Sequence, residues 1–320
     1  MRVLSRGRAG RDREDVIAVR ILVVCAGATG GAFGTLLQEA GRDVTYLVRE
    51  RKAESLRRDG LRFVSPDADR TYPVQVLTTV GARAATQKPF DLVLITVKAT
   101  AFSSAVTDLH PFIGESTRIL PILNGMAHID HLQAAHPGQI LGGLARIVAT
   151  LDGDVVHQRT PMSSLMVGSL TDIPVPEDIR NALDAPGIDL SVADDVMGAL
   201  WDKWAFIAAA SVINCLFRAP VGRVLDAGGE DSIHAAIHEL EAVAARAGHP
   251  VSESAHGQAV ALLTEWDSSF TTSLYRDLTA GLRSEVDHIL GDYALRARTL
   301  QQPTPLLDLA LIAIRANLSN

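Results

Sequence analysis

The chain has 320 residues, which exceeds the usual size of one compact core and predicts two domains. Its formal net charge of −7 argues against a nucleic-acid partner, because nucleic acids bind to basic surfaces. The longest apolar run, residues 204–217, is too short to cross a bilayer and contains Ser211 and Asn214, so we expect no membrane association.

The first 17 residues are rich in arginine and lack the apolar segment of a secretory signal. We expect a disordered extension over residues 1–17. The two cysteines, Cys25 and Cys215, lie in apolar surroundings and are predicted to be free, buried thiols. This cysteine content is typical of the reducing cytoplasm.

Residues 18–192 alternate between continuous apolar runs and helical patterns. Such alternation predicts an α/β domain whose parallel sheet is covered on both faces. Residues 61–65 and 72–80 are expected to form a short hairpin at its edge. The other expected strands occupy residues 20–26, 43–48, 90–100, 117–126 and 139–151, followed by antiparallel strands over 155–158 and 163–170. The expected helices occupy residues 30–41, 100–113 and 128–137.

Residues 193–320 repeat apolar side chains at the spacing i, i+3, i+4, i+7, which predicts an all-helical second domain. We place the boundary near Ala193. The expected helices occupy residues 194–217, 229–248, 252–266, 274–281, 285–300 and 305–317.

The small-residue turn CAGATGG lies between the first strand and the first helix, where a dinucleotide pyrophosphate binds backbone N–H groups. Gly27, Ala28, Thr29 and Gly30 are therefore predicted cofactor contacts. Gly27 lets the phosphate approach, and Gly30 lets the helix pack on the strand. Cys25 replaces the first glycine of the usual fingerprint. The alternative is a glycine-rich turn without a ligand, but the strand before it and the helix after it favour a binding site.

Arg49 follows the second strand, about twenty residues after the turn, at the position that reads the ribose 2′ group. An acid there would bind the 2′-hydroxyl of NAD, whereas arginine suits a 2′-phosphate. Arg51 and Lys52 add positive charge. We expect NADP rather than NAD, although such a run can also be a solvated charge cluster.

Lys98 and Asn124 end two further strands of the predicted sheet. Ligands of such sheets bind at the carboxyl ends of the strands, so both side chains are candidates for the cofactor crevice. Each also has a simpler interpretation, Lys98 as a surface cation and Asn124 as part of an Asn-Gly turn.

Lys203 lies near the start of a long apolar helix. Its side chain either extends to solvent or has a catalytic role. Burial would lower its pKa and make it a proton donor near neutral pH. Ser273 and Glu285 would lie about 18 Å apart on one straight helix. Gly281 predicts a break that folds both towards one site, although Glu285 can also serve as a helix cap.

Seven ordered blocks resemble the ketopantoate reductase (2-dehydropantoate 2-reductase) family. They are ILVVCAGATGG, ITVKA, LNGM, LWDKWAF, RAPVG, SLYRDLTAGLRSEVD and PTPLLDLAL. The resemblance implies a Rossmann domain and a helical domain like that of 6-phosphogluconate dehydrogenase. It further implies NADPH-dependent reduction of a 2-oxo acid in pantothenate biosynthesis.

The same resemblance implies roles for individual residues. Lys203 matches the general acid that protonates the carbonyl oxygen, and Glu285 matches an acid that contacts the cofactor and organises the site. Asn124 matches a contact to nicotinamide and substrate, and Ser273 a contact to substrate. Arg49 and Lys98 match cofactor contacts.

The pattern departs from ketopantoate-reducing members where they often carry asparagine, four and eight residues after the lysine. Ile207 and Ser211 stand there, and we keep Ser211 as a substrate contact. Val221 replaces another polar contact. These changes favour a more apolar 2-oxo or 3-hydroxy acid as the alternative substrate. A non-catalytic NADP-binding sensor is a second alternative.

Two further expectations concern metals and assembly. His234 and His238 have the spacing of metal ligands, but no third ligand motif accompanies them, so we expect no metal site. Helical second domains of this kind often dimerise, and a homodimer is therefore expected.

Overall fold

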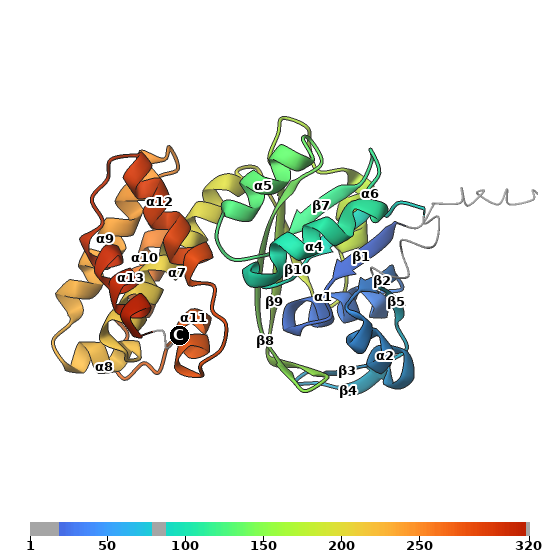
Figure 1. Cartoon of the computed structure of the whole chain (residues 1–320), viewed down its shortest axis with the longest axis horizontal. Coiled ribbons are helices and arrows are strands. Elements are labelled where there is room, and N and C mark those ends of the chain that lie inside the picture. The colour runs from blue at the N-terminus through green and yellow to red at the C-terminus, as the bar shows by residue number, and fades with distance from the viewer. Residues whose placement is uncertain (1–18, 79–87, 318–320) are drawn as a thin grey trace, which may run out of the picture.

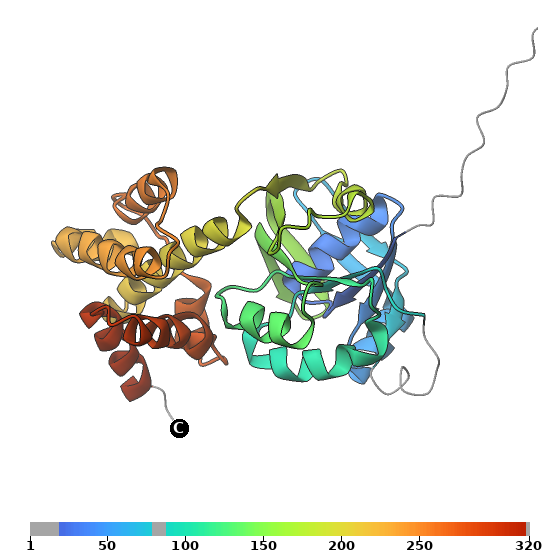
Figure 2. The ribbon, with the colours of Figure 1, turned by 90° about the horizontal axis from the view of Figure 1, so that it is seen from above.

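The structure is a computed structural model that describes residues 19–78 and 88–317. The expected extension over residues 1–17 lies outside the described residues. The chain forms an α/β part and a helical part that lie side by side, with α7 (Val196–Phe217) passing from one into the other (Figures 1 and 2). The predicted fold class, a parallel Rossmann-type sheet followed by helices, is confirmed.

The first sheet is entirely parallel, in the order β5-β2-β1-β6-β7. Its strands are β1 (Arg20–Val24), β2 (Asp43–Leu47), β5 (Gln75–Leu77), β6 (Leu92–Ile95) and β7 (Arg118–Pro121). Leu22 of β1 pairs with Thr45 of β2 on one side and with Val93 of β6 on the other. The associated helices are α1 (Ala28–Glu39), α2 (Glu50–Asp59), the 3-10 turns η1 (Ala99–Ala101) and η2 (His110–Phe112), α4 (Phe102–Leu109) and α5 (Ala127–Ala135).

The second sheet is mixed, in the order β10-β9-β3-β4 with β8 paired to β9. Its strands are β3 (Leu61–Val64), β4 (Asp69–Tyr72), β8 (Leu141–Asp152), β9 (Val155–Ser169) and β10 (Asp189–Ala193), with α6 (Glu177–Leu183) before β10. Helix α1 packs between the two sheets. A Cβ on Gly34 would lie 2.3 Å from the hydroxyl of Tyr46 in β2, and one on Gly31 would lie 2.6 Å from Val156 in β9. These close approaches need glycine, and they fix α1 between the two sheets.

Three details of the predicted strands are wrong. The strand expected over residues 139–151 belongs to the second sheet rather than to the parallel one, because β8 pairs antiparallel with β9. The partner of β3 is β4, whereas residues 75–77 leave the hairpin and join β2 in the first sheet. Pro73 lies between them and cannot donate to a strand ladder, which explains where β4 ends. Residues 155–158 and 163–170 are not separate strands, because β9 runs continuously opposite β8. The register shifts between Ile147 and Ala149, and Pro161 is accommodated in that irregular stretch.

The helical part is built around α7. Around it lie α8 (Val221–Asp226), α9 (Glu230–Arg246), α10 (Glu253–Leu263), α11 (Ser273–Thr279), the π-helical turn η3 (Asp287–Gly291), α12 (Asp292–Thr299) and α13 (Pro305–Asn317). α7 is the one described helix that is long and apolar enough to span a membrane, by length and composition alone. Of its most apolar stretch of 18 residues, 61% is buried inside the protein, as in the core helix of a soluble protein. Strand β10 ends at Ala193, but the domain limits proposed from the sequence stay a prediction.

Candidate active site

The turn after β1 has the backbone shape of a dinucleotide-binding loop despite its cysteine. Cys25 adopts φ +82°, a left-handed conformation that glycine takes easily and that costs another residue about 1 kcal/mol. Thr96 Oγ1 donates to the carbonyl oxygens of Val24 at 2.7 Å and Cys25 at 3.0 Å. The threonine thereby fixes the turn in the shape that the first fingerprint glycine would adopt.

The two glycines of this turn differ in how much space surrounds them. A Cβ on Gly30 would lie 2.2 Å from both Cys25 O and Thr96 Oγ1, so no other residue fits. A Cβ on Gly27 would meet only Cys25 Sγ, at 3.5 Å, which leaves that side open. Helix α1 begins at Ala28, and its N-cap Gly27 supplies no side-chain cap. The first N–H groups of the helix are therefore available to a pyrophosphate, and the residues present fit a dinucleotide.

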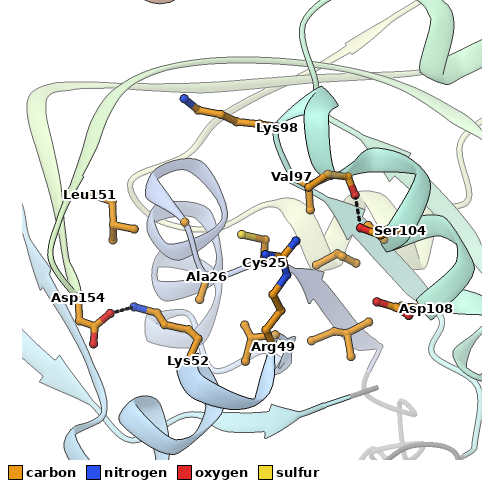
Figure 3. A pocket seen from close by; sticks show the side chains of 16 residues that line it. Cys25, Ala26, Arg49, Lys52, Val97, Lys98, Ser104, Asp108, Leu151 and Asp154 are labelled. Carbon is orange, nitrogen blue, oxygen red and sulfur yellow. Dashed lines mark hydrogen bonds and ion pairs between the residues drawn. The ribbon is translucent and has the colours of Figure 1, made fainter. Parts of the chain in front are cut away.

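A pocket of about 380 Å³ opens beside this turn, at the carboxyl ends of the parallel strands (Figure 3). Val24 and Leu47, the last residues of β1 and β2, line it together with Val97, which follows β6, and Leu151 reaches it from the β8–β9 hairpin. Its charged lining residues are Arg49, Lys52, Lys98, Asp108 and Asp154. This is the place where nucleotides bind in open α/β sheets.

The three cations of the pocket are held differently. Lys52 Nζ lies 2.6 Å from Asp154 Oδ1, and Lys98 Nζ lies 2.7 Å from Asp277 Oδ2 in α11. The guanidinium of Arg49 forms no hydrogen bond or ion pair with any residue that the structure describes, and it extends towards Cys25 (Figure 3). Arg49 is thus free to bind an anion, whereas Lys98 would first have to leave its carboxylate. Burial raises the pKa of the Cys25 thiol in spite of the nearby Lys52 and Arg49, so the thiol stays neutral.

Lys203 lies on the face of α7 that meets the α/β part. Its Nζ donates to the carbonyl oxygen of Ala145 in β8 at 3.0 Å. Burial, and then the charge of Arg146, lower the pKa of Lys203 from 10.5 to about 8. The amine therefore faces the domain interface and can give up a proton near neutral pH.

Glu285 reaches the α/β part through the break that the sequence predicts. Helix α11 ends at Thr279, Gly281 adopts φ +66°, and Glu285 follows just before η3. Its Oε1 accepts a hydrogen bond from the backbone N–H of Ala99 at 2.7 Å. Together with the Lys98–Asp277 ion pair, this bond fastens the loop after β6 to the helical part.

Asn124 occupies the turn after β7, and a histidine pair that the sequence analysis did not assign supports that turn. A Cβ on Gly125, at φ +84°, would lie 2.9 Å from His288 Cδ2. His288 Nε2 lies 3.2 Å from His128 Nδ1 of α5. Burial, and then the charges of His288 and Lys203, lower the pKa of His128 to about 3. Burial also lowers the pKa of His288, so both rings are neutral at pH 7.

His288 could have been noticed as a histidine in an apolar helical pattern, but nothing in the sequence pairs it with His128, which is 160 positions away. The π-helical turn η3 carries His288 to the interface, and such turns are frequent at functional sites. In the same segment, the carbonyl of Ile289 accepts a hydrogen bond from Trp204 Nε1 at 3.0 Å. The turn is therefore fixed to α7, one residue after Lys203.

The two predicted serines lie in the helical part, where Ser211 is buried and Ser273 is exposed. Ser273 is the first residue of α11, and Asn214 holds the start of that helix by accepting from the Thr272 N–H at 2.8 Å. Ser211 is fully buried, and its hydroxyl has no hydrogen-bond partner among the described residues. Neither serine forms a hydrogen bond with Lys203 in the described structure, and their substrate contacts stay predictions.

None of Lys203, Asn124, Ser273 and Glu285 lines the pocket beside the β1 turn. Lys203 and Glu285 form hydrogen bonds across the interface of the two parts, and Asn124 lies beside His288 there. Lys98 crosses the same interface through its ion pair with Asp277. Across the residues that the structure describes, no group of three or more His, Cys, Asp or Glu side chains is arranged to hold a metal ion.

Comparison with known families matches both parts of the chain. The family model "Ketopantoate reductase PanE/ApbA" matches residues 21–172, and the family model "Ketopantoate reductase PanE/ApbA C terminal" matches residues 195–317. A curated relative from Bacillus subtilis, "Uncharacterized oxidoreductase YkpB", is 30% identical over 295 residues, covering 91% of this chain and 96% of the relative.

Solved structures share the whole architecture. A 2-dehydropantoate 2-reductase from Geobacter metallireducens superposes with a TM-score of 0.82 at 24% identity, over 93% of this chain and all of the other. D-mandelate dehydrogenase, solved with NADH and anilino(oxo)acetate, superposes with a TM-score of 0.81 at 18% identity, over 93% of this chain and 98% of the other. At these identities the superpositions show a common fold.

Proposed function

The chain belongs to the ketopantoate reductase family and is an oxidoreductase, and on this premise we propose that it reduces a 2-oxo acid to a 2-hydroxy acid with NADPH. The first candidate reaction is 2-dehydropantoate to pantoate in pantothenate biosynthesis, in the cytoplasm. The observation that carries the proposal is the amine of Lys203, withdrawn from water, facing β8 at the domain interface, with its pKa lowered to about 8.

The cofactor is held by the β1 turn and its pocket. The N–H groups that begin α1, at Ala28 and Thr29, suit the pyrophosphate, and Gly27 leaves room for its approach. Arg49, which has no partner among the described residues, suits a 2′-phosphate through its planar fork of donors. When bound, the nicotinamide supplies a hydride to the carbonyl carbon.

Lys203 acts on the other end of the carbonyl bond. Negative charge develops on the carbonyl oxygen during reduction, and an ammonium group both stabilises and protonates it. A pKa of about 8 leaves most of the Lys203 population protonated at pH 7 while making proton release easier than from an ordinary lysine. The low-dielectric surroundings that lower this pKa also strengthen its attraction for the developing charge.

Glu285 and Asn124 position the reactants. Glu285 reaches Ala99 at the end of the loop that follows β6, where a cofactor contact is expected. Asn124 precedes Gly125, which packs against His288, so the turn that carries Asn124 is held at the interface. Ser211 and Ser273 are proposed substrate contacts, and the unpartnered hydroxyl of Ser211 is available for a hydrogen bond.

A more apolar 2-oxo acid is the second candidate substrate. Ile207 lies one helical turn after Lys203 on the same face of α7, and Val221 is fully buried at the start of α8. Both side chains are hydrocarbons, so neither can hydrogen-bond a hydroxyl or carboxylate. The structure of D-mandelate dehydrogenase with anilino(oxo)acetate shows that this fold also accommodates an aryl-bearing oxoacetate. A non-catalytic sensor is disfavoured because it would need neither Lys203 nor Glu285.

The test is the oxidation of NADPH, followed by absorbance, with ketopantoate and with apolar and aromatic 2-oxo acids. Turnover of at least one acid supports the reductase, and the ranking of kcat/KM values identifies the substrate class. Binding of NADPH without turnover of any acid would instead establish the sensor. We also propose a homodimer, which sedimentation of the full chain at several concentrations will test.

A further inference from the structure

The tip of the β8–β9 hairpin presents an acid to the cofactor pocket. Asp152 pairs with Val155, so Gly153 and Asp154 form a two-residue turn, with Gly153 at φ +58°. Strand β9 is also paired with β3 from Val155 onward. Because two strands hold β9 at its first residue, Asp154 is presented by a fixed element rather than by a free loop.

Both carboxylate oxygens of Asp154 are engaged by the first turns of α2. Oδ1 lies 2.6 Å from Lys52 Nζ, and Oδ2 accepts from Ser55 Oγ at 2.5 Å. Figure 3 shows the Lys52–Asp154 pair at one wall of the pocket, across from Asp108. The hydrogen bonds from Lys52 and Ser55 hold the pKa of Asp154 below its usual range, so this carboxylate is ionised at neutral pH.

The pair changes the charge that an incoming anion meets. Of the three cations that line the pocket, Lys52 is neutralised by Asp154 and Lys98 by Asp277, which leaves Arg49. A phosphate on the ribose 2′ position carries close to two negative charges near neutral pH, whereas the hydroxyl of NADH carries none. A carboxylate beside that position repels the phosphate and competes for Lys52.

We propose that Asp154 is a specificity-determining residue that limits the preference of this pocket for NADPH over NADH by holding Lys52 in an ion pair. The inference rests on the proposed dinucleotide site and is independent of which 2-oxo acid is reduced. Arg49 supplies the attraction for the 2′-phosphate, and Asp154 sets how much Lys52 adds to it.

The test is direct binding of NADPH and NADH to the full-length protein, measured by calorimetry without substrate. Asp154→Asn keeps the size of the side chain but removes its charge. We expect the dissociation constant for NADPH to fall about fivefold, with little change for NADH, because the ion pair is partly exposed. The gain should shrink at high salt, which screens exposed charges.

Two variants give the matched comparison. Asp152→Asn removes the same charge from the same hairpin without touching Lys52, and it should leave the NADPH to NADH ratio within about twofold. Lys52→Ala combined with Asp154→Asn should abolish the gain in NADPH affinity, because the Lys52 ammonium that Asp154→Asn frees from its ion pair is then missing. Equal ratios for Asp154→Asn and Asp152→Asn would overturn the proposal, as would weaker binding of both cofactors by Asp154→Asn.

The outcome is separable from that of the proposed function. A protein that binds both dinucleotides and shows the predicted shift but turns over no 2-oxo acid would contradict the reductase and support the role of Asp154. A wild-type protein that binds neither dinucleotide would overturn both the cofactor site and this inference.

Discussion

The pocket beside the β1 turn and the interface between the two parts of the chain are assembled in opposite ways. Half of the residues that line the pocket come from one early stretch of chain, residues 24–52, and the charges of the pocket are partly exposed and mostly paired. The interface draws on residues separated by long stretches of chain, such as His128, Lys203 and His288, and its groups are withdrawn from water. Because charge interactions strengthen as water is excluded, single changes at the interface should have larger effects than those in the pocket.

The largest expected effect is that of Lys203→Ala. Loss of the proton donor should lower kcat with the best 2-oxo acid by about 1,000-fold. The dissociation constant for NADPH, measured by fluorescence, should stay unchanged, because Lys203 does not line the cofactor pocket. A kcat close to that of the wild type would remove Lys203 from the mechanism.

The second effect is the pH dependence of kcat/KM. The pKa of Lys203 is lowered to about 8, so the ammonium that donates the proton is present below pH 8 and is lost as the pH rises above it. We expect a fall of about tenfold per unit of pH above 8, or about 100-fold at pH 10. The guanidinium of Lys203→Arg keeps its proton at these pH values. Any activity that this variant retains should therefore show no fall in kcat/KM between pH 8 and pH 10. A wild-type rate that holds level to pH 10 would contradict this assignment.

The third effect concerns the pocket. Arg49→Glu should weaken NADPH relative to NADH by about 30-fold, because a charged hydrogen-bond donor is replaced by a repelling carboxylate. Arg51→Glu is the control, since this neighbour is exposed and does not line the pocket. If the two variants change the ratio of the NADPH and NADH dissociation constants equally, Arg49 does not bind the 2′-phosphate specifically.

The smallest effect concerns stability in acid. His128 is neutral in the folded protein down to pH about 3, whereas the unfolded chain binds the proton below pH 6.5. The free energy of unfolding should therefore fall as the pH drops below 6.5, by about 1–2 kcal/mol at pH 5 from this group. His128→Gln should lose less stability over that range in urea titrations, whereas His131→Gln, an exposed change on the same helix, should behave as the wild type.

Much of the fold follows from the sequence because its signals are local. The spacing of apolar residues predicts the parallel strands and the long helices, and the Gly281 break is marked by a single residue. The path after β4 is decided by a choice between two sheets that Gln75 to Leu77 could join equally well by pattern. The continuity of β9 through Pro161 likewise depends on its partner β8, which the local pattern does not contain.

The site divides in the same way. The turn geometry at Gly27 and Gly30 is predictable, since it depends on neighbouring backbone atoms between a strand and a helix, and so is the position of Arg49 after the second strand. The left-handed conformation of Cys25 is harder to predict from the sequence, because it depends on Thr96, which follows the adjacent strand β6. The pairing of Lys98 with Asp277 and of Lys52 with Asp154 could not be foreseen, because a sequence shows charges but not which of them meet.

The sequence by itself predicted the class of chemistry, through a small-residue turn between a strand and a helix, a lysine in an apolar helix and the resemblance to a reductase family. Only the tertiary structure decided which charges are free to act. Arg49 is left without a partner among the described residues, while Lys52 and Lys98 are held by acids brought from distant parts of the chain. The physical reason is that the strength of a charge depends on its neighbours and on water, and both are set by folding.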